Sequence, residues 1–295
     1  MAARTLLHPY PSDVRREQGT LKRWFTRLMT YLILGTWSLF TIFAIGWVTV
    51  ASFKTGREVF RKPLHLPTAL QWKNYDKAWN LVRMGEYLGN SVLIVSVSLA
   101  LLLAVSTPAA YALSRFAFWG RNLIMTAFIG GLGIPFPLLF IPLFAIVTAL
   151  RVVNTIPGLI LVYVSVSIPF TVYLLTGFFV TLPRELEEAA TIDGCTSSQV
   201  FWHVMLPLAS PGLITAAIFN GIGLWKEYQL ALVFVNNPDN RTLSLGLYAM
   251  QNAMQYTGDW PGLFAGVVIV MVPTIFLYIF LSEKMISGVT MGSGK

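Results

Sequence analysis

The chain has 295 residues, of which 55% are hydrophobic and only 12% are charged, and its formal net charge is +8. An ordinary globular domain carries about 25% charged residues, so this composition excludes a soluble domain and indicates an integral membrane protein. The single cysteine excludes an internal disulfide, and no basic run interleaved with aromatic residues points to nucleic acid.

Six apolar runs reach the length of about 20 residues that a helix needs to cross a bilayer. Backbone inside lipid must satisfy its own hydrogen bonds, so we expect six transmembrane helices and an all-α fold. The runs are Thr30–Phe53, Tyr87–Leu113, Asn122–Thr148, Gly158–Val180, Gly212–Phe234 and Pro261–Ser282. The third contains GGLGIPFPLLFIP (Gly130–Pro142), for which a cavity-lining break and a plain kink are both open interpretations.

Basic residues predict the orientation of these helices. Residues 1–29 form a basic tail that is expected in the cytoplasm, and six crossings return the C-terminal tail, residues 283–295, to the same side. The first external loop, Lys54–Glu86, is also basic, so charge alone leaves the orientation nearly ambiguous. Within this loop, Leu66–Glu86 has aromatic residues near helical spacing, which suits a short helix on the membrane or a surface for an external partner.

The stretch Leu182–Pro211 is the longest polar interruption in the second half of the chain. Pro183 and three following glutamates predict the start of a short helix, and Gly194 predicts its end. Thr196 and Gln199 have the spacing of a capping box, which predicts a second helix.

The second helix is expected to end at Pro207 and to carry one apolar face, formed by Val200, Phe201, Val204 and Met205. The helix pair is too short to span a bilayer, so we expect it at the membrane surface.

Seven residues of this stretch resemble the EAA motif of ABC-transporter permeases with its spacing intact: Glu188, Ala189, Ala190, Asp193, Gly194, Leu206 and Pro207. Val204 stands where the motif has Ile, and Cys195 where Ala is common. We call Leu182–Pro211 the EAA loop. The resemblance implies a coupling helix that docks on a cytoplasmic ATPase. A partnerless interfacial helix is disfavoured, because such helices usually carry a basic polar face and this one is acidic.

Two further segments are similar to carbohydrate-importer permeases. AYALSRFAFWGR (Ala110–Arg121) resembles the segment after their second helix, and SGVTMGSGK (Ser287–Lys295) resembles the G-L-T-A-G ending of maltose-type subunits. Val289 and Met291 depart from that ending. The resemblance implies a type I ABC importer permease domain over residues 30–295, with both termini in the cytoplasm.

The fifth run contains the only charged residues within any apolar span, Lys226 and Glu227. A charge near a bilayer centre costs about 2.5–3.5 kcal/mol on insertion scales and usually faces a wet cavity or a bundle interior. The family often has W-N-E-[FY] here, and this chain matches it except at Lys226. The candidate substrate-pathway residues are therefore Trp225, Lys226, Glu227 and Tyr228. For Lys226, snorkelling to the outer interface is an equally good interpretation.

The resemblance implies a permease subunit of an ATP-driven ABC importer in a prokaryotic inner membrane, which forms half of the pathway for a sugar or oligosaccharide. Its implied partners are a second permease, two ATPase subunits and an external solute-binding protein. ATP and Mg would be bound by the ATPase, and no cofactor or metal is expected on this chain.

No catalytic constellation is expected, because His8, His65 and His203 are scattered and the sequence has no phosphate-binding G-x-x-x-x-G-K-[ST]. One alternative is an importer of a polyol phosphate or another small polar solute. The other is an ion-coupled secondary transporter, for which internal repeats and several intramembrane carboxylates would be expected. The sequence has neither.

Overall fold

The computed structural model describes the backbone of residues 13–292 and the side chains of residues 24–279. Within these limits all regular structure is helical. Four helices are long and apolar enough to cross a membrane: α1 (Asp13–Ser52), α4 (Met84–Arg115), α7 (Ile156–Thr181) and α14 (Trp260–Gly292). They correspond to the first, second, fourth and sixth predicted runs, although α1 begins well before Thr30.

The third predicted run is not one helix. It forms α5 (Arg121–Leu132), the 3₁₀ turn η2 (Phe136–Leu139) and α6 (Phe140–Ala149), and the two arms meet at 111°. Pro135 and Pro137 lack a backbone donor and disfavour helical geometry in the residue before each of them, which explains the break.

The fifth predicted run is also broken. It forms α11 (Ser210–Lys226) and α12 (Gln229–Phe234), separated by the extended backbone of Glu227. A second bent pair, residues 197–208 with residues 210–226, meets at 68°. Counting each bent pair as one span raises the described membrane-crossing segments from four to as many as six.

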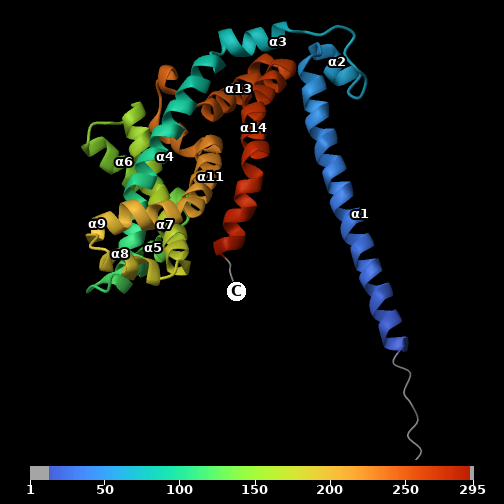
Figure 1. The fold of residues 1–295 in the computed structure, drawn as a ribbon. Coiled ribbons are helices and arrows are strands. Elements are labelled where there is room, and N and C mark those ends of the chain that lie inside the picture. Colours follow the sequence, from blue (N-terminus) through green and yellow to red (C-terminus); the bar gives the residue numbers. More distant parts are fainter. Residues whose placement is uncertain (1–12, 293–295) are drawn as a thin grey trace, which may run out of the picture.

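Two groups of short helices lie at the two ends of the bundle (Figure 1). The EAA loop forms α8 (Glu185–Ile192), α9 (Ser197–Val200), the π-helical η3 (Phe201–Met205) and α10 (Leu206–Leu208), and we call its end of the bundle the EAA end. The opposite end carries α2 (Gly56–Arg61), α3 (Lys73–Asp76), the π-helical η1 (Lys77–Leu81), the 3₁₀ turn η4 (Pro238–Asn240) and α13 (Leu243–Thr257). The predicted short helix within Leu66–Glu86 thus exists as α3 and η1.

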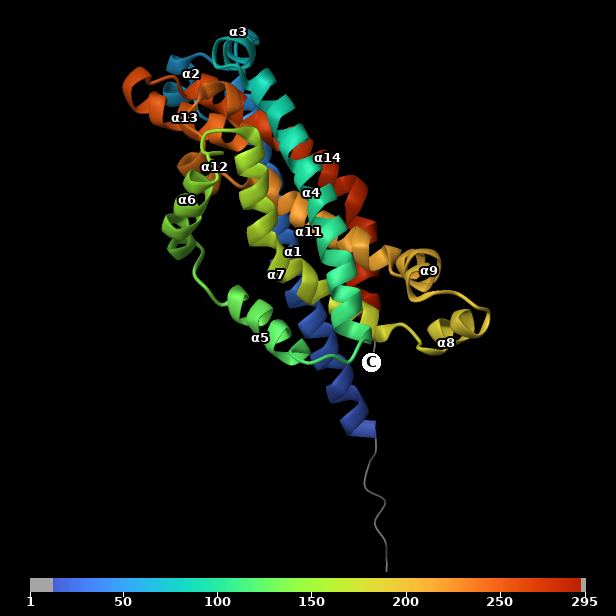
Figure 2. The ribbon, with the colours of Figure 1, turned by 90° about the vertical axis from the view of Figure 1, so that its left-hand side faces the viewer.

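The bundle is organised around α4 and α7, which run side by side, with α5 and α6 at its outer edge (Figure 2). Aromatic and aliphatic side chains fill the layers between the helices. Near the EAA end the core contains Tyr111, Phe179 and Met205, and further along it contains Tyr163 and Phe234, all at most 6% exposed. Close-packed side chains of this kind fix the helix positions.

Helix α13 is part of the bundle at its start and exposed at its end. Leu243 is fully buried, and a Cβ at Gly246 would lie 2.3 Å from the Tyr87 ring of α4. Ser244 Oγ donates to the carbonyl of Trp225 at the end of α11. The first turn of α13 therefore closes over the break in the fifth run.

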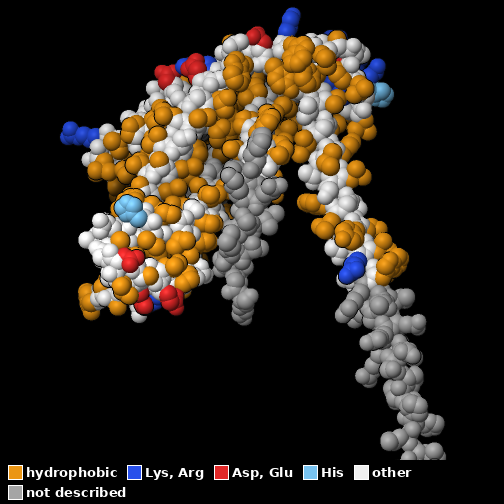
Figure 3. Space-filling model, in the orientation of Figure 1, with side chains coloured by type: hydrophobic (Ala, Val, Ile, Leu, Met, Phe, Trp, Pro, Cys, Tyr) orange, Lys and Arg blue, Asp and Glu red, His pale blue; other side chains and the backbone are white. Residues whose placement is uncertain are grey.

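Helix α1 stands apart from the bundle along most of its length (Figure 1). It meets α14 near the opposite end, where the Trp47 and Phe264 rings lie 5.5 Å apart. None of the residues in its most apolar 18-residue stretch, which lies within Trp24–Ser52, is buried. Trp37 and Leu39 are each 70% exposed. Figure 3 shows charged side chains gathered at the two ends of the molecule with a hydrophobic band between them, as expected for a membrane protein.

Candidate functional site

The first helix of the EAA loop ends in a Schellman motif. The N–H of Gly194 donates to Thr191 O and the N–H of Cys195 donates to Ala190 O, both at 3.0 Å. Gly194 occupies the left-handed region with φ +87°, which only glycine adopts without strain. The predicted stop at Gly194 is confirmed, and the helix begins at Glu185, two residues after Pro183.

The second helix begins with the predicted capping box. Thr196 N donates to Gln199 Oε1 at 2.8 Å, and Gln199 N donates back to Thr196 Oγ1 at 3.4 Å. The Schellman motif that ends the first helix is thus followed directly by the capping box that begins the second. The local hydrogen bonds of these two motifs fix the angle between the helices. The second helix ends at Leu208, one residue after the predicted end at Pro207, and the chain then bends by 68° into α11.

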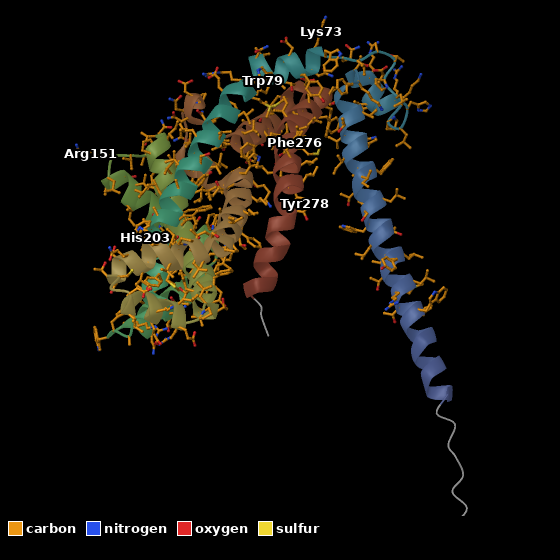
Figure 4. The ribbon with its side chains drawn as sticks, viewed as in Figure 1. Lys73, Trp79, Arg151, His203, Phe276 and Tyr278 are labelled. Atoms are coloured by element: carbon orange, nitrogen blue, oxygen red, sulfur yellow. The ribbon has the colours of Figure 1, made fainter. Side chains whose placement is uncertain are left out.

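The apolar face of the second helix packs on its own bundle. Val200, Phe201 and Met205 are 3%, 7% and 0% exposed, and the Phe201 ring lies 5.0 Å from that of Tyr111 on α4. The side that remains free carries Trp202, 59% exposed, and His203, which projects outward in Figure 4. The EAA loop therefore holds to the membrane helices by one face and offers the other to solvent.

The seven EAA-motif residues divide between these two faces. Ala190 is 9% exposed and Leu206 half-buried, so they contribute to packing. Glu188, Ala189, Asp193, Gly194 and Pro207 are exposed. Close to them lies Ile192, an aliphatic side chain 86% exposed at the tip of α8. The exposed set is an acidic surface with one protruding apolar side chain.

A buried ion pair joins the EAA loop to α4. Arg115 Nε lies 2.8 Å from Glu187 Oε1, and Arg115 Nη2 donates to Leu182 O at 2.7 Å. The side chains are 4% and 20% exposed. Burial raises the pKa of the Glu187 carboxyl above its ordinary value, against the opposing charges of Arg115 and Arg184.

This pair is costly to desolvate, so its effect lies in fixing position more than in stability. Sequence reasoning missed it, because an arginine at the end of a membrane helix is ordinarily a flanking charge. One feature of the sequence pointed to this pair. The EAA loop has several acidic residues in the first turn of its helix, and favourable interaction with the helix dipole does not require all of them.

The second group of candidate residues lies at the break between α11 and α12. Glu227 accepts hydrogen bonds from Tyr163 Oη at 2.8 Å, Leu230 N at 2.6 Å and Ala231 N at 3.2 Å. Its carboxylate thus caps α12 and anchors it to α7. All three of these donors are protein groups, and the extended backbone here is held by this cap.

The other three candidates face different cavities. Trp225 is 7% exposed and borders an apolar cavity of about 380 Å³ between α4, α11 and α14, and its Nε1 has no described partner. Lys226 and Tyr228 border a second cavity of about 420 Å³ together with Ser244, Leu247, Tyr248, Gln251 and Val270. The structure therefore brings Lys226 and Tyr228 together and separates them from Trp225 and from the Glu227 carboxylate.

No group of three or more His, Cys, Asp or Glu side chains suited to a metal ion occurs among the described residues. His65 and His203 lie at opposite ends of the molecule, and His8 lies outside the described residues. The C-terminal resemblance, Ser287–Lys295, also lies outside the described side chains.

Residues 96–283 match the family model described as binding-protein-dependent transport system inner membrane component. The diacetylchitobiose uptake system permease protein NgcG of Streptomyces coelicolor is 36% identical over 90% of this chain and 88% of its own length. The arabinooligosaccharides transport system permease protein AraQ of Halalkalibacterium halodurans is 34% identical over 86% of this chain and 91% of its own.

Among solved structures, a chain from a bacterial ABC transporter involved in the import of the acidic polysaccharide alginate superposes with a TM-score of 0.74. The match covers 94% of this chain and 99% of that chain, at 22% sequence identity. This likeness shows a shared fold.

Proposed function

The chain belongs to the family of binding-protein-dependent transport system inner membrane components, and from this premise we propose that it carries a sugar or oligosaccharide as one of two permeases of an ABC importer. It is a multi-pass membrane protein with a transport role and the fold of an ABC importer permease. The observation that supports a saccharide is the match, at 36% and 34% identity over most of both chains, to permeases named for diacetylchitobiose and arabinooligosaccharides.

The EAA loop is the proposed contact with the ATPase. Its packed face and the Arg115–Glu187 pair tie it to α4, while its exposed residues present Glu188, Asp193 and Ile192 outward. A rigid element fixed on one side and free on the other can transmit a displacement of its partner to the membrane helices. ATP and Mg belong to the partner in this proposal, and this chain holds no cofactor.

Two apolar surfaces support a second permease as partner. Helix α1 exposes Trp37 and Leu39, and α14 exposes Phe276 and Tyr278 at 57% and 59% (Figure 4). These helices meet near the opposite end and diverge toward the EAA end (Figure 1). The helices of a second permease, together with lipid, are proposed to cover both surfaces. An external solute-binding protein would then dock at the opposite end. The membrane that holds the permease is proposed to be a prokaryotic inner membrane.

Trp225, Lys226, Glu227 and Tyr228 remain our proposed pathway residues. The contacts of Glu227 support a role in positioning the helices around the pathway. Its carboxylate stabilises the break between α11 and α12 by capping α12 and bonding to Tyr163 of α7. Lys226 and Tyr228 are the members of the group whose side chains border a cavity that also has hydroxyl and amide groups.

The proposed function is tested by reconstituting this chain in proteoliposomes with its second permease, ATPase and binding protein. Radiolabelled di- and trisaccharides are expected to accumulate only with internal ATP. Uptake driven by an ion gradient without ATP would contradict the proposal. If the complex takes up polyol phosphates and no saccharide, the proposed solute would be a polyol phosphate instead of a saccharide.

The proposed orientation predicts that a membrane-impermeant maleimide labels Cys195 only after cells are opened. The thiol is partly exposed on the EAA loop, and it is the sole cysteine of the chain. As a control, Lys73→Cys on α3 at the opposite end should be labelled in intact cells, since Lys73 projects outward (Figure 4). Labelling of Cys195 in intact cells, with Lys73→Cys protected, would reverse the orientation.

A further inference from the structure

The cavity beside Lys226 lies near the opposite end of the bundle. Helix α11 has 17 residues and ends at Lys226. At about 1.5 Å per residue it rises about 25 Å from the EAA end, against a hydrocarbon core of about 30 Å. The cavity volume of about 420 Å³ falls within the range of roughly 300–1,000 Å³ for ligand pockets. A solute delivered from outside would reach this cavity early in its path.

The walls of the cavity suit a saccharide. The Tyr228 and Tyr248 rings stack with centroids 5.1 Å apart and planes at 27°, and Tyr228, 37% exposed, keeps part of its ring surface accessible. Ser244 and Gln251 add a hydroxyl and an amide to the two phenol groups. Aromatic faces beside hydroxyl and amide groups match the apolar C–H faces and hydroxyl edges of a sugar ring.

Lys226 brings a positive charge that its neighbours do not balance. The four ion pairs among the described residues do not include it, and no described hydrogen bond uses its ammonium group. The adjacent carboxylate of Glu227 is directed to Tyr163 and to the backbone of α12. An unpaired ammonium group that borders a cavity with hydroxyl and amide groups is suited to an anionic ligand, because a charge-assisted hydrogen bond is stronger than a neutral one.

We propose that this cavity binds an anionic saccharide, whose carboxylate or sulfonate pairs with the Lys226 ammonium group while the tyrosine rings contact the sugar. The inference rests on the proposed function, because it needs the cavity to lie on the path of the solute. A lipid phosphate or a carboxylate of the second permease would satisfy Lys226 equally well by charge, but neither uses the tyrosine, serine and glutamine side chains.

The test compares matched disaccharides that differ only at C6, one neutral and one a uronate, in proteoliposomes with the complete complex and an unchanged binding protein. Lys226→Gln should raise the KM for uronates about tenfold or more, since it removes one charge-assisted hydrogen bond, and should leave the KM for neutral sugars within about twofold. Lys226→Arg should stay close to the parent. Lys73→Gln on α3 removes a charge at the same end outside the cavity and should change neither KM.

The outcomes separate the two proposals. Uptake of neutral sugars without any uronate uptake by the parent would overturn the anion site and leave the proposed function standing. Equal KM changes for both sugars in Lys226→Gln, or none, would also overturn it and assign Lys226 to lipid or to the second permease. If Lys226→Gln fails to assemble, Gln251→Leu at the exposed edge of the cavity should raise both KM values. An unchanged KM there would refute the cavity, and uptake of no saccharide at all would refute the proposed function itself.

Discussion

Gly194→Val is expected to abolish ATP-driven uptake while the membrane helices still insert and the complex still forms. Gly194 sits at φ +87° in the Schellman motif, and no described atom lies within 4 Å of an added Cβ. The cost is therefore backbone strain, roughly 1–2 kcal/mol for an ordinary L-residue and more for a β-branched one. The cheapest relief is to unwind the motif, which frees α8 from the capping box that follows it.

The measurement is uptake and ATPase rate in proteoliposomes, with assembly followed by co-purification. Gly194→Asn should retain most uptake, because Asn tolerates the left-handed region. Gly258→Val gives a matched control, since Gly258 has φ +63° and equally open surroundings at the end of α13. Normal uptake by Gly194→Val would remove the turn from the coupling proposal. If Gly194→Asn lowers uptake as much as Gly194→Val does, the requirement for glycine comes from close approach of the ATPase and not from the positive φ.

The turn could be predicted from sequence because its determinants are local. The Schellman glycine, the Thr196–Gln199 capping box and the apolar face of the second helix each depend on residues a few positions apart. The four long helices could be predicted for a similar reason, because a bilayer demands about 20 apolar residues whatever surrounds them.

The break in the fifth run could not be predicted from hydropathy. Glu227 lies within the run Gly212–Phe234, and its cap on α12 requires Tyr163 from a different helix. The closure of α13 over this break depends on Ser244 reaching the Trp225 carbonyl and on Gly246 fitting against Tyr87. Hydropathy reports how apolar a segment is, whereas these contacts depend on which helices become neighbours.

The link between the EAA loop and α4 was likewise out of reach, and it carries the second large expected effect. Arg115→Met should lower uptake at least about tenfold and raise ATP hydrolysis that is not coupled to transport. The substitution leaves the largely buried Glu187 carboxylate without its partner and removes the bond to Leu182 O. Removing one partner of a buried pair costs roughly 3–5 kcal/mol, and the 20% exposure of Glu187 places this pair at the low end.

A double-substitution cycle separates positioning from simple loss of stability. Arg115→Met with Glu187→Met removes the unpaired charge, so thermal stability should recover toward the parent. Uptake should remain low, because α8 is then no longer tied to α4 by the ion pair.

Arg121→Met is the matched control. Arg121 also donates hydrogen bonds to the end of α4, at Leu113 O and Ser114 O, but it has no described acidic partner on the EAA loop. It should reduce stability slightly and leave coupling intact. Recovery of uptake together with stability in the double variant would mean that the pair only stabilises the fold, and the path from α8 to the membrane helices would then run through the Phe201–Tyr111 contact.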